Sequence, residues 1–151
     1  MAFVTQQEYL KRTVRAAAIL TSSYVAGTVI GADSINGTTQ EVTSDNVDQF
    51  NFLALEVDFT LGSLTTAGII VEFSEDNSTW FQVQKSTTSG GVTTFLPYVI
   101  QLSATGKYYI NINSECFNGG GFHSRYFRIS AIGVGTATSS SMTITAITGV
   151  V

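Results

Sequence analysis

Apolar and polar residues alternate with a period of two along most of the chain after Ser23, which is the pattern of a β-strand with one buried and one exposed face. Runs of this kind are separated by clusters of Gly, Ser, Thr, Asn and Asp, which favour turns. Strands that recur at intervals of about ten residues are typical of a β-sandwich or a β-barrel. The pattern predicts eight strands, at residues 24–30, 50–60, 68–74, 80–86, 92–102, 107–113, 125–133 and 141–148.

In three of these strands the alternation also predicts which side chains are buried. Within residues 50–60, Glu56 and Asp58 stand between apolar residues and are expected to face water. One dry and one wet face per strand indicates antiparallel sheets, so we predict an all-β fold, an antiparallel and jelly-roll-like β-sandwich. Pro97 has no N–H to donate, which predicts that its strand lies at a sheet edge or bends there. The predicted inward residues are Leu53, Leu55, Val57, Phe59, Ile69, Val71, Phe73, Tyr108, Ile110 and Ile112.

Residues 5–20 have a different pattern, in which apolar side chains recur every three or four positions. Leu10, Val14 and Ala17 would share one face of a helix, and Thr5 followed by Glu8 has the spacing of a capping box. We therefore predict a short N-terminal amphipathic helix, with residues 1–22 as a helical arm and residues 23–151 as a single sandwich domain. So short a helix is stable only when its apolar face docks on something. The candidate partner-binding residues of this segment are Leu10, Lys11, Arg12, Val14 and Arg15.

A second candidate contact lies in the loop of residues 114–123, which contains three consecutive glycines. Phe117 and Phe122 are apolar anchors on this flexible stretch, and we expect them to contact a partner together with His123. Cys116 and His123 could nominally supply a thiolate nucleophile and its base. Catalysis requires a fixed geometry, however, and a glycine-rich backbone does not provide one. We therefore assign no catalytic residue and expect no enzymatic activity.

Composition narrows the possible classes of function. Hydrophobic residues make up 44% of the chain and charged residues 12%, a balance that favours a folded core over disorder. One Cys and one His cannot form a zinc finger or an internal disulfide. A net charge of −4 with seven basic residues disfavours nucleic acid as a partner, because neutralising phosphates requires clustered Lys and Arg. We expect no cofactor.

The charges are unevenly distributed along the chain. No basic residue lies between Arg15 and Lys85, whereas nine acidic residues do. A solvated acidic surface is the simpler interpretation, and the other is that the basic N-terminal arm of one copy is steered to the acidic surface of a neighbour. The acidic residues lack the alternating oxygen spacing and closing Glu of a calcium loop, so we expect no metal site.

Membrane and export signals are also weak in the sequence. No run approaches the ~20 apolar residues of a membrane span, and we expect no membrane partner. The apolar run at residues 16–20 follows basic residues but is shorter than the apolar region of a secretory signal. We therefore expect synthesis in the cytoplasm without a cleaved leader.

Two segments resemble hairpins of known β-sandwich proteins. In residues 71–83 a strand ends in Ser74-Glu75-Asp76, turns, and resumes at Trp80. The sequence 125–129 (Arg-Tyr-Phe-Arg-Ile), followed by a turn rich in Gly, Thr and Ser and by residues 142–147, resembles the closing hairpin of the same proteins. Both segments are similar to those of small tailed-phage virion proteins, including head decoration proteins, and of discoidin-like carbohydrate-binding domains.

The resemblance to virion proteins implies a non-enzymatic structural role in a bacteriophage particle, as a capsid decoration or head-associated protein made in the host cytoplasm and located in the virion. The implied partners are further copies of the chain, with a trimer favoured, and other virion proteins such as a major capsid protein. The alternative resemblance implies a carbohydrate-binding module of the discoidin-like type, which binds glycans through aromatic and Arg side chains on loops. The early Asp-Gly and Thr-x-Trp stretch usual in those domains is not found in this sequence.

Overall fold

The computed structural model describes residues 9–31, 52–112 and 125–149. These residues form β-strands joined by turns and contain no helix, and every strand pair among them is antiparallel. The predicted all-β class with antiparallel sheets is confirmed. The strands are β1 (Tyr9–Ala18), β2 (Val25–Ala26), β3 (Ile30–Gly31), β4 (Phe52–Thr60), β5 (Leu64–Ser74), β6 (Phe81–Gln82), β7 (Gln84–Ser89), β8 (Val92–Pro97), β9 (Ile100–Leu102), β10 (Gly106–Asn111), β11 (Tyr126–Gly135) and β12 (Ser141–Gly149).

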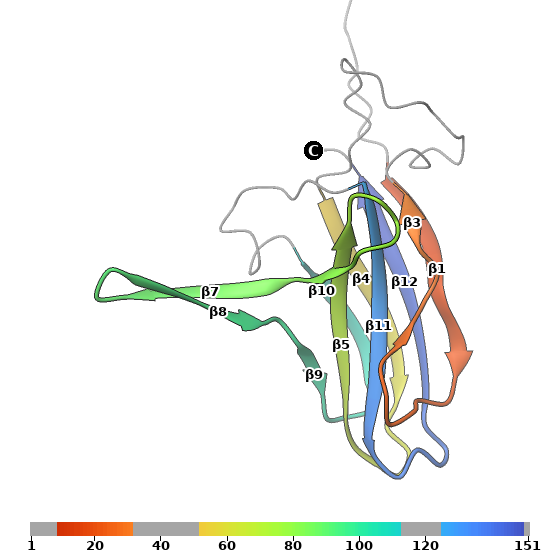
Figure 1. The fold of residues 1–151 in the computed structure, drawn as a ribbon. Helices are drawn as coiled ribbons and strands as arrows, with labels where there is room; N and C mark the ends of the chain where they lie inside the picture. The colour runs from red at the N-terminus through yellow and green to blue at the C-terminus, as the bar shows by residue number, and fades with distance from the viewer. Residues whose placement is uncertain (1–8, 32–51, 113–124, 150–151) are drawn as a thin grey trace, which may run out of the picture.

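The strands form two sheets that face each other and one separate ribbon (Figure 1). The first sheet has the order β1-β12-β4-β10, and the second has the order β2-β11-β5-β6, with β3 also paired to β11 and β9 to β5. The ribbon consists of β7 and β8 alone. In Figure 1 the strands β5 and β11 lie in front of β4 and β12, and the ribbon projects sideways from this sandwich-like body. We call the two sheets together the sandwich.

The core of the protein lies between the two sheets. In β4 the four predicted inward side chains, Leu53, Leu55, Val57 and Phe59, are all buried, whereas Asp58 is exposed. Burying one large apolar side chain stabilises a fold by about 1.5–3 kcal/mol. The four buried side chains of β4 therefore determine which face of this strand points toward the core. The other central strands add Ile69, Val71, Phe127, Ile129, Met142 and Ile144 to the same core.

The other side chains predicted to point inward also lie at the core, but most of them are less completely buried. Ile112 is fully buried, and Phe73, Tyr108 and Ile110 are partly buried and packed against the core. β10 is an edge strand of the first sheet, so its inward side chains are covered from fewer directions than those of β4.

Two predicted strands are each divided between the sandwich and the ribbon. The predicted strand 80–86 separates at Val83 into β6 in the second sheet and β7 in the ribbon, and the predicted strand 92–102 separates into β8 and β9. Pro97 is the last residue of β8, so the predicted bend lies where the chain leaves the ribbon. The alternation of side chains continues where a strand passes from one sheet to another, so the sequence pattern did not reveal this division.

The segment between β2 and β3 joins the two sheets along one side of the sandwich. The N–H of Gly27 donates to the carbonyl oxygen of Ile129 in the second sheet, and the N–H of Thr28 donates to that of Val14 in the first sheet, both at 2.8 Å. A Cβ atom on Gly27 would collide with the carbonyl oxygen of Val14. The predicted strand 24–30 is therefore interrupted at a glycine, the residue that allows this close backbone approach.

The predicted N-terminal helix is wrong over residues 9–18, which form β1 and pair with β12 along their length. The register shifts between Thr13 and Arg15 and again between Arg15 and Ala18, as at β-bulges, where one strand carries an extra residue. Each shift delays the alternation by one position, so apolar residues acquire a helix-like spacing. Pairing with β12 then outweighs a modest helix propensity. This part of the predicted arm belongs to the sandwich, and residues 5–8 lie outside the described residues.

Candidate functional site

We refer to the ribbon of β7 and β8, residues 84–97, as the arm. It is a different segment from the N-terminal arm predicted for residues 1–22. Every residue of the ribbon is exposed, and Figure 1 shows it extending away from both sheets. Its turn contains Gly90 and Gly91, with φ angles of 59° and 77°, a left-handed conformation that glycine adopts at little cost. Two such residues in succession are typical of the tight turns that match the twist of a β-hairpin.

Both faces of the arm present apolar side chains to solvent. Lys85 lies opposite Leu96, and Ser86 lies opposite Phe95, and successive residues of a strand point to opposite faces. Leu96 is 56% exposed and Phe95 is 64% exposed. An isolated two-stranded ribbon is marginally stable in water, and its open edges can pair with another chain. In the described structure the arm is therefore the element best suited to contact a partner.

The root of the arm is fixed to the sandwich by Val83, which precedes β7, and Tyr98, which follows β8. The N–H of Val83 donates to the carbonyl oxygen of Val71 in β5, and the N–H of Tyr98 donates to that of Val83, both at 2.9 Å. Both side chains belong to the core. The core thus sets where the arm begins and ends.

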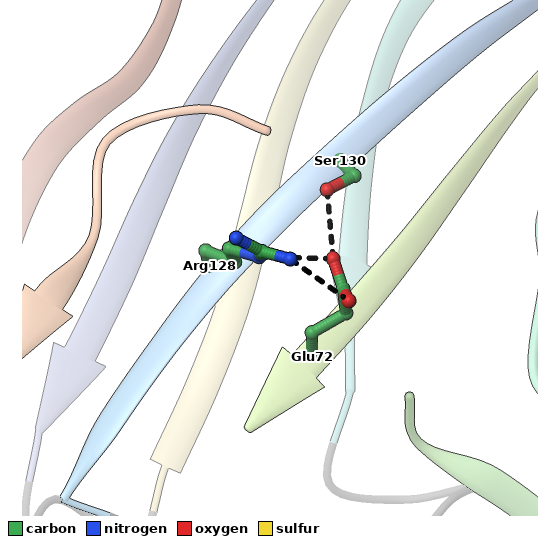
Figure 2. Close-up of polar contacts among 3 residues, drawn as sticks. All are labelled: Glu72, Arg128 and Ser130. Atoms are coloured by element: carbon green, nitrogen blue, oxygen red, sulfur yellow. Dashed lines mark hydrogen bonds and ion pairs between the residues drawn. The ribbon is translucent and has the colours of Figure 1, made fainter. Parts of the chain in front are cut away.

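A polar cluster on the second sheet lies beside the same root. The Nε and Nη2 atoms of Arg128 donate to the two carboxylate oxygens of Glu72 at 3.0 and 3.2 Å, and the Oγ of Ser130 donates to Oε1 of Glu72 at 2.9 Å (Figure 2). The guanidinium carbon of Arg128 lies 4.4 Å from the ring centroid of Trp80, a cation–π contact. Trp80 immediately precedes β6, so the cluster ties the segment leading to the arm onto β11.

The turn before Trp80 is organised by a single carboxylate. Oδ1 of Asp76 accepts from the N–H groups of Thr79 at 2.7 Å and Ser78 at 2.8 Å and from the hydroxyl of Ser74 at 3.0 Å. The hydrogen bonds from the Thr79 and Ser78 backbone, followed by that from Ser74, lower the pKa of Asp76 to about 2. These bonds favour the charged form because only the carboxylate accepts all of them.

A shallow groove of about 480 Å³ lies on the outer face of the first sheet. Its size falls in the range of small-ligand sites. Side chains at alternate positions of β4, β10 and β12 supply most of its lining, because they point to the same face of the sheet, and Val57 and Tyr108 lie between them in the sequence. The lining residues are Glu56, Val57, Asp58, Lys107, Tyr108, Tyr109, Thr143 and Thr145.

The groove combines an exposed aromatic ring with polar groups that have no partner in the described structure. Tyr109, 62% exposed, lies opposite Glu56, and Lys107 lies opposite Asp58. Glu56 forms an ion pair with Lys11 of β1 at 2.9 Å. Among residues 9–31, 52–112 and 125–149, no side-chain hydrogen bond or ion pair involves Asp58, Lys107 or Tyr109. These three groups can therefore bind a partner without losing an existing bond.

Most of the predicted N-terminal contact residues contact the sandwich itself. Val14 is 2% exposed and lies in the core, and Lys11 binds Glu56. Burial lowers the pKa of Arg15 from its usual range. The Arg15 guanidinium donates to backbone carbonyls at the irregular end of β1 and in β12, namely those of Ala16, Ala18, Ile19 and Met142.

The other predicted contacts are less fully defined. Arg12 is half-buried and makes an interaction within the chain, and Leu10 lies in β1. Phe117, Phe122 and His123 lie outside the described residues, as does Cys116. Contact of any of these residues with a partner stays a prediction.

The arm was missed by the sequence reasoning although a signal for it exists. Residues 84–89 (Gln-Lys-Ser-Thr-Thr-Ser) contain no apolar residue, so this stretch has nothing to place in a core. A strand that is polar at every position, followed by Gly90-Gly91 and by a strand rich in apolar residues, indicates a hairpin outside the sandwich.

Residues 9–31, 52–112 and 125–149 contain neither a metal-binding cluster nor a membrane-spanning helix. No group of three His, Cys, Asp or Glu residues that could hold a metal ion occurs there. The same residues form no helix long and apolar enough to cross a membrane.

No protein-family model matches the chain, and no curated protein matches it in sequence. Among solved structures, it is similar to the SPBc2 prophage-derived protein YomS, with a TM-score of 0.47 and 15% sequence identity over 99% of each chain.

Proposed function

We propose that this chain is a non-enzymatic structural protein of a bacteriophage particle, a capsid decoration or head-associated protein that works by self-association and adhesion to a protein lattice. The observation that carries the proposal is the arm, which extends from the sandwich with apolar side chains on both faces and both edges open. Exposed apolar surface of this kind marks a contact with another protein. The resemblance of residues 71–83 and 125–147 to virion proteins supports the phage assignment.

The energetics of the arm support the proposed self-association. Phe95, Leu96 and Val92 are each more than half exposed, and burying such side chains in a contact stabilises it by about 25 cal/mol per Å² of apolar surface. Every copy carries an arm, so association of identical chains buries many arms at once. Mass action then stabilises both the subunit and the assembly. A homo-oligomer, with a trimer favoured, bound to a major capsid protein is the proposed state in the virion.

The sandwich is proposed to be a jelly roll. Its strands divide into two sheets of four when β2 and β3 count as one interrupted strand and β6 and β9 as one edge beside β5. Consecutive strands cross repeatedly between the sheets, since β4 and β5 belong to different sheets, as do β11 and β12. Eight strands in two such sheets support the jelly-roll assignment.

The experiment that tests the proposed function removes the arm and keeps its root. Residues 84–97 are replaced by Asn-Gly, a two-residue turn between Val83 and Tyr98, whose backbones already share a hydrogen bond. We expect native mass measurement to show a multiple of the 16.1 kDa chain for the natural protein and a folded monomer for the shortened one. The proposal fails if the natural protein is monomeric at micromolar concentration and does not bind phage capsids.

The non-enzymatic part of the proposal has its own test. Cys116→Ala is expected to leave assembly and capsid binding unchanged. A hydrolytic activity that this substitution abolishes would contradict it.

The alternative function is carbohydrate binding, and the groove is the observation that favours it. An exposed Tyr109 ring beside the Asp58 carboxylate and the hydroxyls of Thr143 and Thr145 provides a stacking surface and hydrogen-bonding groups of the kind that sugars use. Binding to an oligosaccharide array that Tyr109→Ala abolishes, in a chain that stays monomeric, would favour this alternative over the virion role.

A further inference from the structure

We propose that the arm of one copy docks in the groove of another copy, with Lys85 of the arm paired to Asp58 of the groove. The inference rests on the proposed function, self-association, and specifies the surface that receives the arm.

The arm presents one cation beside one apolar side chain. Lys85 and Leu96 are directly opposite each other in the β7–β8 pair, so their side chains lie on the same face, about 5 Å apart at Cβ. Lys85 is the one charged residue of the arm, and it has no ion pair or side-chain hydrogen bond in the part of the chain that the structure describes. Its ammonium is available for a carboxylate of another molecule.

The groove presents the complementary arrangement. Glu56 and Tyr109 form one cross-strand pair, and Asp58 and Lys107 form the next pair but one along the same two strands. The Tyr109 ring offers an apolar surface to Leu96, and Asp58 offers a carboxylate to Lys85. Glu56 already binds Lys11 at 2.9 Å. Lys107 lies opposite Asp58, but Asp58 makes no ion pair among the described residues, so its carboxylate oxygens can accept a cation of another copy.

Within the described residues, the outer face of the second sheet does not offer a comparable site. Its carboxylate, Glu72, accepts three hydrogen bonds from Arg128 and Ser130 and is largely buried, with a side-chain exposure of 15%. An incoming Lys85 would have to displace Arg128, whose forked guanidinium binds a carboxylate more favourably than an ammonium does. Charge complementarity therefore favours the groove on the first sheet.

The groove and the arm that fills it belong to different copies. No arm residue lines the groove of its own chain, and the arm extends away from the sandwich (Figure 1). Each copy has one arm and one groove, so contacts can close reciprocally in a dimer or from head to tail in a ring such as a trimer. A closed assembly buries every arm, whereas an open chain leaves one exposed.

The test exchanges the two charges. Lys85→Glu places a carboxylate against Asp58 and Glu56, and Asp58→Lys places an ammonium against Lys85, so we expect each single variant to associate at least about tenfold more weakly than the natural protein. The double variant carries both reversed charges and is expected to associate as the natural chain does. An equal mixture of the two single variants is expected to recover association as a reciprocal dimer, because each arm then finds a groove of opposite charge, whereas a ring of three copies would keep one mismatched contact.

Two controls separate charge pairing from general effects. Glu75→Lys makes the same charge change as Asp58→Lys at an exposed turn residue outside the groove, and it should leave association unchanged. Lys85→Arg keeps the charge and should associate normally. Because Asp58 and Lys85 are both exposed, the variants are expected to fold, which circular dichroism and thermal unfolding check.

Sedimentation velocity gives outcomes that separate this inference from the proposed function. If arm deletion abolishes association but the single charge reversals do not, the arm binds elsewhere, so the docking inference is wrong and the proposed function stands. Failure of the double variant to recover association also overturns the docking inference. If the groove binds an oligosaccharide through Tyr109 while association survives Tyr109→Ala, the groove receives a sugar and not an arm. A monomeric natural protein contradicts the docking inference, and one that is monomeric and also does not bind phage capsids contradicts the proposed function as well.

Discussion

The sandwich and the arm contain the same kinds of residue in opposite environments. Phe59 of β4 is fully buried between the sheets, whereas Phe95 of β8 is 64% exposed. Each sheet of the sandwich is covered by the other, so its strands have one dry face. The arm has no second layer, and its two faces are wet. The chain therefore completes its own core in the sandwich and leaves the apolar side chains of the arm exposed, where the proposed association would cover them.

The largest expected effect is on the free energy of unfolding, and a matched pair of substitutions, one in the sandwich and one in the arm, measures it. Phe59→Ala leaves a cavity in the core and should lower the free energy of unfolding by about 3–5 kcal/mol. Phe95→Ala should change the free energy of unfolding of the monomer by less than about 0.5 kcal/mol, and it should weaken association. Denaturant unfolding at low protein concentration and sedimentation velocity measure the two effects. An equal loss of stability in both variants would mean that the arm packs on its own sandwich.

A second prediction concerns the boundary between the two regions, at the root of the arm. Glu72→Ala leaves Arg128 and Ser130 without their carboxylate in a partly buried site, and we expect a loss of about 2 kcal/mol. Trp80, the one tryptophan of the chain, contacts Arg128 and should report the change by its fluorescence. Glu56→Ala removes the exposed ion pair with Lys11 and should cost about 0–1 kcal/mol. Similar losses in both variants would contradict the structural role of the cluster.

A smaller effect is expected in β1, the strand that the sequence mispredicts. Arg15→Ala removes the side chain that donates to carbonyls at the irregular end of β1 and in β12. We expect a loss of about 1 kcal/mol, and Arg15→Lys should restore it only in part, because an ammonium lacks the fork of the guanidinium. The association constant should stay unchanged. A change in association without a change in stability would instead support Arg15 as a partner-binding residue.

The smallest expected effect depends on pH and concerns the turn before the arm. The folded protein holds the pKa of Asp76 at about 2, below the ordinary value of 3.8. The stabilising contribution of this carboxylate is therefore present above pH 4 and is lost as the pH falls toward 2. We expect the thermal midpoint of the natural protein to fall more steeply between pH 4 and pH 2 than that of Asp76→Asn.

Glu75→Gln is the matched control for this pH experiment. It removes a charge from the same turn without removing a hydrogen bond to Asp76, and its pH profile should follow that of the natural protein. Identical slopes for all three proteins would show that the hydrogen bonds to Asp76 do not stabilise the fold.

The sequence predicted a strand well where buried and exposed residues alternate regularly along it. β4 was predicted closely because apolar residues occupy every second position and a turn follows its last residue. β1 was mispredicted because two register shifts disturb its alternation. The division of residues 80–86 between two sheets was missed because a period of two does not identify the partner strand.

The candidate site was less predictable than the fold. The arm carries a local signal, in its polar strand and its two glycines, but its direction depends on Val83 and Tyr98 being held in the core. The groove joins residues from β4, β10 and β12, which are separated by about fifty and about thirty-five positions along the chain. No local pattern brings Asp58, Tyr109 and Thr145 together.

The sequence by itself determined that the chain forms antiparallel strands and which side chains of the central strands are buried, because the burial of alternate residues is a local property of each strand. Only the tertiary structure decided which strands are neighbours, that residues 9–18 join a sheet, and that residues 84–97 remain outside both sheets. These choices depend on long-range pairing and on the space left between the sheets, and neither is encoded in the spacing of residues along one strand.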